Sequence, residues 1–360
     1  MKNSEYWKRR FELLEQSQNN KGIKCFADIE EQYRRAQGRI EGAIAAWYQR
    51  FAKNNAISMK EARRLLSNKE LEELKWDVRE YIRYGKENAV NGVWMEQLEN
   101  ASARYHISRL EALKLHMQQH LEVMFGNQLD CIDLAMRDIY KSGYYHSAFE
   151  IQKGMGVGWD FATLDERKIS KVINKPWAAD GRNFSERVWG NRTKLVNELN
   201  TELTHNIILG QDPQKAIEAI ARKMNSSKSA AGRLVMTEEA FFSSAAQRDC
   251  FKELDVEMFE VVATLDSHTS EICREMDGKV FPVSQWEIGS TAPPFHVWCR
   301  TTTVPAFGDE FDGTGKRAAR GEDGKTYYVP ASMKYKDWQK SFIGDDKSVL
   351  RKMQEENRLS

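Results

Sequence analysis

Apolar side chains recur every three or four positions through long stretches of the first half of the chain. One stripe runs between residues 26 and 51 and consists of Phe26, Ile29, Tyr33, Ala36, Ile40, Ile44, Trp47 and Phe51. Another follows Ser108 and consists of Leu110, Leu113, Met117, Leu121 and Met124. This spacing places each stripe on one face of a helix. The stripes predict long helices packed against one another, while an exposed stripe would indicate a surface that docks on a partner.

Two capping boxes predict further helix starts between these stripes. At Ser58–Glu61 and Ser67–Glu70 a serine is followed three positions later by a glutamate, which is typical of a helix N-terminus. Residues 1–150 therefore predict an antiparallel array of long helices, which would form a helical N-terminal domain. Glycines at 154, 156 and 158, followed by Lys175-Pro176, interrupt the periodicity, so residues 151–182 predict a connector.

Helical periodicity returns after the connector and then gives way to short strands. Asp212 and Pro213 suit the N-cap and first position of one helix, and another helix is predicted from about Ser229 to Leu254. Runs rich in valine, phenylalanine and threonine predict strands, at 257–265, 279–281 and 301–304. The predicted fold is mainly α with a small C-terminal α+β module, in which long antiparallel helices precede a helical domain capped by a short sheet with long loops. This second domain takes residues 183–306.

The last part of the chain differs in composition from the rest. Residues 309–324 are charged and rich in glycine, so residues 307–360 predict a flexible charged C-terminal extension. Within it, Tyr327–Pro330 predicts a short strand, and residues 333–342 predict a docking element.

Composition narrows the class of protein. The 360 residues carry 54 Lys and Arg against 53 Asp and Glu, so no overall positive charge points to nucleic acid. Nothing approaches 18 uninterrupted apolar residues, and the charged start lacks the apolar core of a secretory signal, so we expect no membrane anchor and no signal peptide. Five widely spaced cysteines do not suggest a disulfide framework, and we expect the protein to be made in a reducing cytoplasm.

Metal-competent side chains are concentrated between residues 266 and 305. They are Asp266, His268, Cys273, His296 and Cys299. Thiolate and imidazole ligands suit tetrahedral zinc, and the His-x-x-Cys pair has close ligand spacing. Cys273 would join this pair from across a loop, with Asp266, His268 or water as the fourth ligand. A metal would stabilise a module whose small sheet buries little apolar surface.

Other interpretations of these residues stay open. The two cysteines could pack as small apolar side chains, with the histidine bonded to backbone, or could form a disulfide with each other. A Cys–His nucleophilic pair is a further alternative, but no orienting third group or oxyanion site can be identified. Glutamates on the predicted helices, such as Glu238 and Glu239, are interpreted as part of solvated faces or as partners of the helix dipole. We therefore assign no catalytic and no cofactor-binding residue.

The same region resembles the Mu F-like phage head morphogenesis family of minor head (minor capsid) proteins. The resemblance rests on Leu265-Asp266-Ser267-His268-Thr269, Cys273, the run from Asp277 to Pro282, and the run from Pro293 to Thr301. The upstream run from Arg233 to Glu239 also resembles the Arg-Thr-Glu helix of the family. Where the family has Arg, Pro and a last Cys, this chain has His268, Val297 and Thr301. The similarity extends over residues 183–305.

This resemblance implies a structural protein of the virion, made in the host cytoplasm during assembly. The expected partners are the portal protein and a scaffold or major capsid protein. The resemblance also leaves open a non-specific contact with packaged DNA. Basic residues of the C-terminal extension could contact phosphates, but acidic residues are interleaved with them, so an ordinary solvated loop is the preferred interpretation. The alternative is an enzyme or virion-delivered effector that uses the Cys/His module, such as a metal-dependent hydrolase or a transferase. Only about 55 residues follow Pro305, which is short for a separate catalytic domain.

Overall fold

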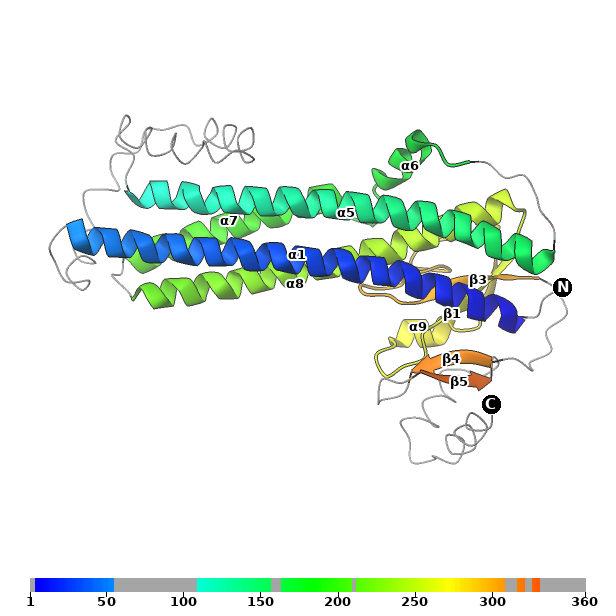
Figure 1. Ribbon diagram of the computed structural model, residues 1–360. Coiled ribbons are helices and arrows are strands. Elements are labelled where there is room, and N and C mark those ends of the chain that lie inside the picture. Colours follow the sequence, from blue (N-terminus) through cyan, green and yellow to red (C-terminus); the bar gives the residue numbers. More distant parts are fainter. Residues whose placement is uncertain are drawn as a thin grey trace, which may run out of the picture. The chain divides into compact units, whose positions relative to one another are not determined.

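The computed structural model is mainly helical, with a small antiparallel sheet near its C-terminal end (Figure 1). It describes residues 4–54, 109–156, 163–208, 212–307, 316–320 and 326–330. The longer helices are α1 (Ser4–Asn54), α5 (Arg109–Met155), α7 (Phe184–Ile208) and α8 (Pro213–Glu253), and the shorter ones are α6 (Glu166–Ile173) and α9 (Glu271–Met276). The strands are β1 (Met258–Val262), β2 (Val280–Pro282), β3 (Thr302–Ala306), β4 (Lys316–Arg320) and β5 (Thr326–Pro330). The predicted fold class is thereby confirmed.

The chain divides into two compact units; three of the four boundaries between them fall inside α1, α5 and α8, and the fourth lies between α6 and α7. The bundle unit consists of Phe26–Ile132 and Pro176–Gly232. The module unit consists of Met1–Cys25, Asp133–Lys175 and Arg233–Ser360. Each unit therefore combines segments that are distant in sequence. The division into domains at residues 150, 182 and 306 stays a prediction.

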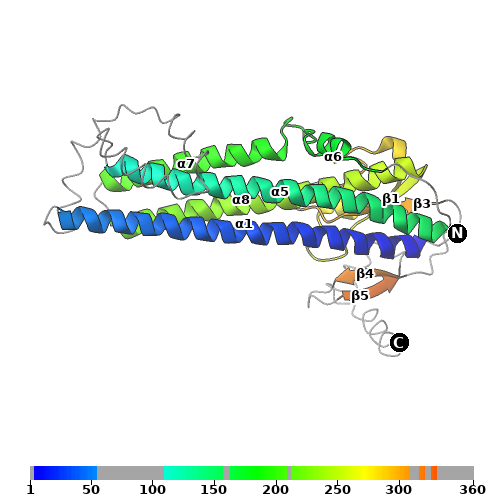
Figure 2. The same cartoon turned by 45° about the horizontal axis from the view of Figure 1, so that its top comes forward.

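In the bundle unit, four helical segments lie side by side (Figure 2). Their buried side chains are the ones that the periodicity singles out, among them Ile29, Ile40, Ile44, Leu113, Met117, Leu121, Leu195, Leu199 and Leu203. The ring centroids of Tyr33 and Phe125 are 6.1 Å apart, and the Tyr33 hydroxyl lies 2.8 Å from the Ser227 hydroxyl. The predicted stripes are thus helix-to-helix core.

Helices α7 and α8 of the bundle unit begin with recognisable caps. Before α7, the Asn183 side chain accepts a hydrogen bond from the Glu186 N–H, and the Glu186 carboxylate accepts one from the Asn183 N–H. This reciprocal pair is a capping box. Before α8, the Asp212 carboxylate accepts from the Gln214 N–H, and Pro213 is the first helical residue, as predicted.

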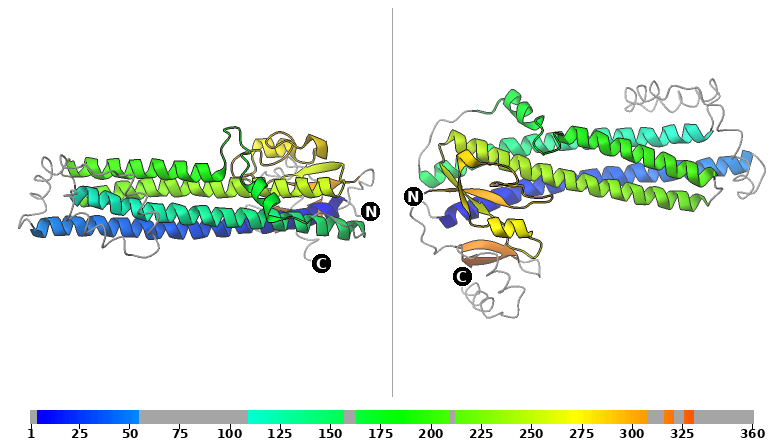
Figure 3. Two further views of the ribbon diagram at one scale, coloured as in Figure 1. Left: turned by 90° about the horizontal axis from the view of Figure 1, so that it is seen from above. Right: turned by 180° about the vertical axis from the view of Figure 1, so that it is seen from behind.

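In the module unit, a three-stranded sheet of order β2-β1-β3 lies beside the start of α1 and the end of α8 (Figure 3). Both strand pairings are antiparallel, with Phe259 of the central strand opposite Phe281 and Pro305. The ring of Phe11 packs against Phe251, with centroids 5.7 Å apart. The three predicted strands are therefore present, although each is shorter than or slightly displaced from its predicted range.

Other expectations have different outcomes. The predicted start of a separate helix near Ser229 is wrong, because α8 continues without a break from Pro213 to Glu253. Its mid-helix serines donate to carbonyls four residues earlier instead of capping a new helix. The strand predicted at Tyr327–Pro330 is present as β5, which pairs with β4 in antiparallel orientation. The capping boxes at Ser58 and Ser67 and the docking element at 333–342 lie outside the described residues.

Within the described ranges, none of the helices combines the length and the apolar character that crossing a bilayer requires.

Candidate metal centre

Cys273 reaches the centre from α9, which begins directly after the loop that follows β1. Ser270 is the N-cap of this helix, and its side chain accepts a hydrogen bond of 3.4 Å from the Cys273 N–H. The helix ends at an Asp277-Gly278 step, where Gly278 has a φ of +76° that favours glycine. The Asp277 carboxylate accepts from the Ala263 N–H at 2.9 Å and ties the end of α9 to the end of β1. Cys273 thus stands on a short helix held at both ends.

His296 and Cys299 come from the loop that precedes β3. Nδ1 of His296 lies 2.7 Å from the Val297 carbonyl oxygen, which can only accept a hydrogen bond. Nδ1 therefore carries a proton, and Nε2 is directed toward the cysteine sulfurs. Between the two ligands, Trp298 has a φ of +62°, which is unusual for a large side chain. Its N–H donates to the Thr237 hydroxyl of α8 at 3.4 Å, which helps to hold this turn.

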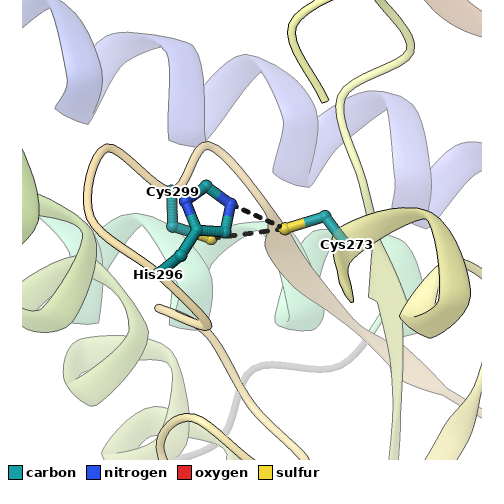
Figure 4. Close-up of side chains that lie close together, drawn as sticks. All are labelled: Cys273, His296 and Cys299. Carbon is teal, nitrogen blue, oxygen red and sulfur yellow. Dashed lines mark hydrogen bonds between the residues drawn. The ribbon is translucent and has the colours of Figure 1, made fainter. Parts of the chain in front are cut away.

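The three side chains converge on one point, as Figure 4 shows. Sγ of Cys273 is 3.1 Å from Nε2 of His296 and 3.7 Å from Sγ of Cys299. In a tetrahedral zinc site, bond lengths of about 2.3 Å to sulfur and about 2.0 Å to nitrogen imply roughly 3.8 Å between sulfurs and roughly 3.5 Å between sulfur and nitrogen. The sulfur pair already has this separation, and the imidazole is within half an ångström of it. The donor set therefore fits zinc.

The pKa shifts of Cys273, His296 and Cys299 are also compatible with metal binding by these side chains. A hydrogen bond from the Cys273 thiol, and a further one from His296, hold the pKa of Cys299 well below its usual range despite burial. The same bond to Cys299, together with burial, raises the pKa of Cys273. The bond to Cys299 also raises the pKa of His296. The lowered pKa of Cys299 favours the thiolate form that binds metal, and binding a metal would release the remaining protons.

The structure brings together Cys273, His296 and Cys299, and leaves Asp266 and His268 outside this group. Asp266 is buried and receives two hydrogen bonds from the Arg300 guanidinium, one of them 2.8 Å long. It also accepts from the His268 N–H at 2.9 Å and from the Thr269 hydroxyl at 3.1 Å. Burial opposes ionisation of Asp266, but the bonds to Arg300 outweigh it and lower its pKa. The His268 side chain is exposed.

Asp266 therefore acts as a tie between two loops. It lies after β1, and Arg300 lies before β3, next to Cys299. The Thr264 hydroxyl makes a parallel connection by donating to the Arg300 carbonyl at 2.8 Å. Arg300 is the functional neighbour that the sequence reasoning missed. A buried aspartate needs a positively charged partner, so an arginine close to Asp266 could have been sought in the sequence.

A second polar cluster lies in the module unit between α1, α8 and β3. The Glu15 carboxylate accepts from the Ser243 hydroxyl at 2.7 Å and from the Thr302 hydroxyl at 3.2 Å. Burial raises the pKa of Glu15 to about 7. Burial, the charge of Glu15 and that of Cys299 raise the pKa of Glu239. The interpretation of Glu238 and Glu239 as solvated is wrong, because both are 2% exposed.

The comparisons with known proteins agree with the motif. Residues 197–304 match the family model of Phage Mu protein F like protein, which confirms the resemblance over this segment and fits a role in phage head morphogenesis. The matched segment includes Cys273, His296 and Cys299.

A curated relative adds a second similarity. The NAD(+)--arginine ADP-ribosyltransferase EFV of Enterococcus faecalis (strain ATCC 700802 / V583) is 28% identical over 153 residues, which are 40% of this chain. The match spans only 30% of the length of that protein. No solved structure matches the chain.

Proposed function

We propose that the chain is a minor head (minor capsid) protein that acts in head morphogenesis and is incorporated into the virion. The observation that carries this proposal is the family match over residues 197–304, which includes the whole Cys/His centre. The centre and its supporting ties serve to hold loops together, and we assign it no turnover. The portal protein is the first expected partner, with a scaffold or major capsid protein next and packaged DNA as a non-specific contact.

The long helices supply the docking surface in this proposal. Four large apolar side chains on α1 and α5 are exposed, namely Leu13, Ile23, Leu134 and Phe149. Exposed apolar side chains of this size are typical of protein contacts when they gather on one surface. Deletion of residues 1–150 would be a poor test, because it would also remove Trp7 and Phe11 from the core of the module unit.

The sharper experiment is co-expression of the full chain with the portal, scaffold and major capsid proteins encoded beside it, followed by purification of the particles. We expect the chain in the particles, and we expect replacement of the four exposed apolar residues by serine to abolish its incorporation. Ile272→Ser, which changes an exposed apolar residue on α9, is the matched control and should be incorporated normally. Absence of the unaltered chain from the particles would reject the proposed function. Normal incorporation of the quadruple variant would reject the docking surface alone.

For the centre itself, we propose a structural zinc ion bound by Cys273, His296 and Cys299. Zinc would cross-link α9 to the loop before β3 and would supply no chemistry beyond that link. The sequence assigns the fourth position to Asp266, His268 or water. Because Asp266 is engaged by Arg300 and the exposed His268 lies outside the Cys/His group, water suits this position better.

The curated relative supports a second candidate, an effector with arginine ADP-ribosyltransferase activity. Only 30% of that protein is matched, so its activity does not follow for this chain. The two candidates are separated by incubating the purified full chain with labelled NAD and a small guanidine acceptor. Under the head-protein proposal no label is transferred, whereas transfer that depends on the chain would favour the effector.

A further inference from the structure

Helix α6 carries a group of exposed cations that the proposed role does not explain. Its inner face is apolar, with Ile169 and Ile173 buried. The other face and the turn after it carry Arg167, Lys168, Lys171 and Lys175, all of which are exposed. Helical spacing separates the two faces, since Arg167 and Lys171 are one turn apart and opposite Ile169. We refer to these four residues as the α6 basic face.

These cations have no carboxylate partner among the described residues. The acidic neighbours are engaged elsewhere: Asp165 caps the helix by accepting from the Lys168 N–H, and Glu166 lies 3.8 Å from the Arg137 guanidinium of α5. Most other arginines with described contacts are paired, as with Arg187 and Asp180 or Arg248 and Asp249. In a chain whose charges nearly balance, this is a local excess of positive charge.

The basic face is also hollowed. Arg167, Ser170, Lys171, Asn174 and Lys175 line an open hollow of about 650 Å³, with no acidic residue in its lining. Lysine, arginine, serine and asparagine side chains are the groups that contact nucleic-acid phosphates. Arg167 and Lys171 are about 6 Å apart along the helix axis, so both can contact phosphates of the same DNA segment.

We propose that the α6 basic face binds the phosphate backbone of duplex DNA without reading its sequence. This inference deepens the proposed function, on which it rests for the identity of the DNA, and it assigns the contact to α6 and not to the C-terminal extension. A membrane surface suits the face less well, because its exposed side carries no large apolar side chain to insert among lipids. The absence of aromatic side chains from the lining argues against stacking on single-stranded bases.

The test uses the full chain and fluorescence anisotropy with a labelled duplex of mixed sequence. The key variant replaces Arg167, Lys168, Lys171 and Lys175 with glutamine. The matched control removes four exposed lysines elsewhere, through Lys141→Gln, Lys194→Gln, Lys215→Gln and Lys252→Gln. Both variants lose the same net charge, so a difference between them reports position and not overall charge. Circular dichroism should be unchanged in both, because the altered side chains are exposed.

We expect the α6 variant to bind the duplex at least ~10-fold more weakly than the control at ~100 mM salt, and the slope of log K against log salt to fall by about 3 to 4. Equal affinities of the two variants would overturn the inference, as would absence of duplex binding by the unaltered chain. Binding of the unaltered chain to vesicles containing phosphatidylserine, without binding to the duplex, would overturn it in favour of a membrane contact. Incorporation into particles is scored separately, so failure of the DNA contact and failure of the head-protein role can be told apart.

Discussion

The bundle unit and the module unit are stabilised by different kinds of contact. In the bundle unit, buried apolar residues recur along each helix and meet equivalent residues of the neighbouring helices. In the module unit, many of the buried contacts are polar and join segments far apart in sequence. Lys8 of α1, for example, pairs with Glu260 of β1 at 2.7 Å, and Gln247 of α8 donates to Thr302 of β3 at 2.9 Å.

This difference indicates which substitutions should destabilise each unit. A helical bundle with a continuous apolar core tolerates many single changes, because each removes only a part of the buried area. Buried polar clusters behave otherwise, since loss of one partner leaves the other desolvated and unpaired. We therefore expect the module unit to respond to metal and pH. The bundle unit contains a buried ion pair of its own, between Glu122 and Arg192, where loss of one partner should also be costly.

The largest expected effect is that of Cys299→Ser on the module unit. Loss of the thiolate should reduce bound zinc from about one ion per chain to none detectable, because two remaining ligands hold zinc poorly. The loops between residues 266 and 305 should then become cleavable by protease, while the far-UV circular dichroism of the long helices is retained. Elemental analysis and limited proteolysis measure both effects.

Cys131→Ser is the control for this prediction, because Cys131 lies in the bundle unit away from the centre. It should leave the zinc content unchanged. If the reduced, freshly purified protein contains no metal, zinc is eliminated as the cross-link. Cys299→Ser should then destabilise the module by only about 0.5–3 kcal/mol, as an ordinary core substitution does.

The next effect concerns the bundle unit, where Glu122 of α5 pairs with Arg192 of α7. Their side chains are 6% and 16% exposed, so the pair is largely desolvated. Glu122→Gln should lower the free energy of unfolding by about 3–5 kcal/mol, because it leaves a buried guanidinium without its countercharge. Urea denaturation followed by circular dichroism measures this loss.

The double variant Glu122→Leu/Arg192→Met tests whether the unpaired charge of Arg192 causes this loss of stability. Replacing both partners with apolar side chains should recover most of the lost stability, since no unpaired charge remains. If the double variant is as unstable as Glu122→Gln, packing and not charge is responsible.

The smallest effect is the pH dependence that Glu15 imposes on the module unit. Because the pKa of Glu15 is raised from 4.5 to about 7 in the folded protein, its carboxyl is neutral in the folded state below that pH. The contribution of Glu15 to the free energy of unfolding is therefore fully present below about pH 4.5, where the carboxyl is neutral in both the folded and the unfolded state. This contribution is lost as the pH rises through 7, by roughly 3 kcal/mol in total.

Glu15→Gln should reduce this dependence, because an amide can accept from Ser243 and Thr302 without acquiring charge, while the raised pKa of Glu239 leaves a remaining dependence of the same sign. Unfolding of the module unit, measured between about pH 5 and pH 8, should then change less with pH than in the unaltered chain. Glu275→Gln makes the same chemical change on an exposed position of α9 and should leave the pH dependence intact. A variant curve parallel to that of the unaltered protein would contradict the assignment to Glu15.

The sequence by itself indicated the long helices and the short strands, though not all of their bounds, and the grouping of the candidate ligands. Helical periodicity is a local property, so the stripes between residues 26 and 51 and after Ser108 predicted α1 and α5. The strands were predictable because short runs of valine, phenylalanine and threonine favour extended backbone. Cys273, His296 and Cys299 could be grouped because ligand side chains are rare enough in this chain to be recognised together.

Only the tertiary structure decided which distant segments share a unit and what each buried polar side chain contacts. The start of α1 belongs with the sheet, although more than 200 residues separate the two in sequence. The same holds for Asp266, which the sequence offered as a ligand and the structure pairs with Arg300. Glu15 and Glu239 looked like ordinary helix glutamates until packing buried them. Desolvation and charge pairing depend on neighbours brought together by folding, and no local pattern of residues records them.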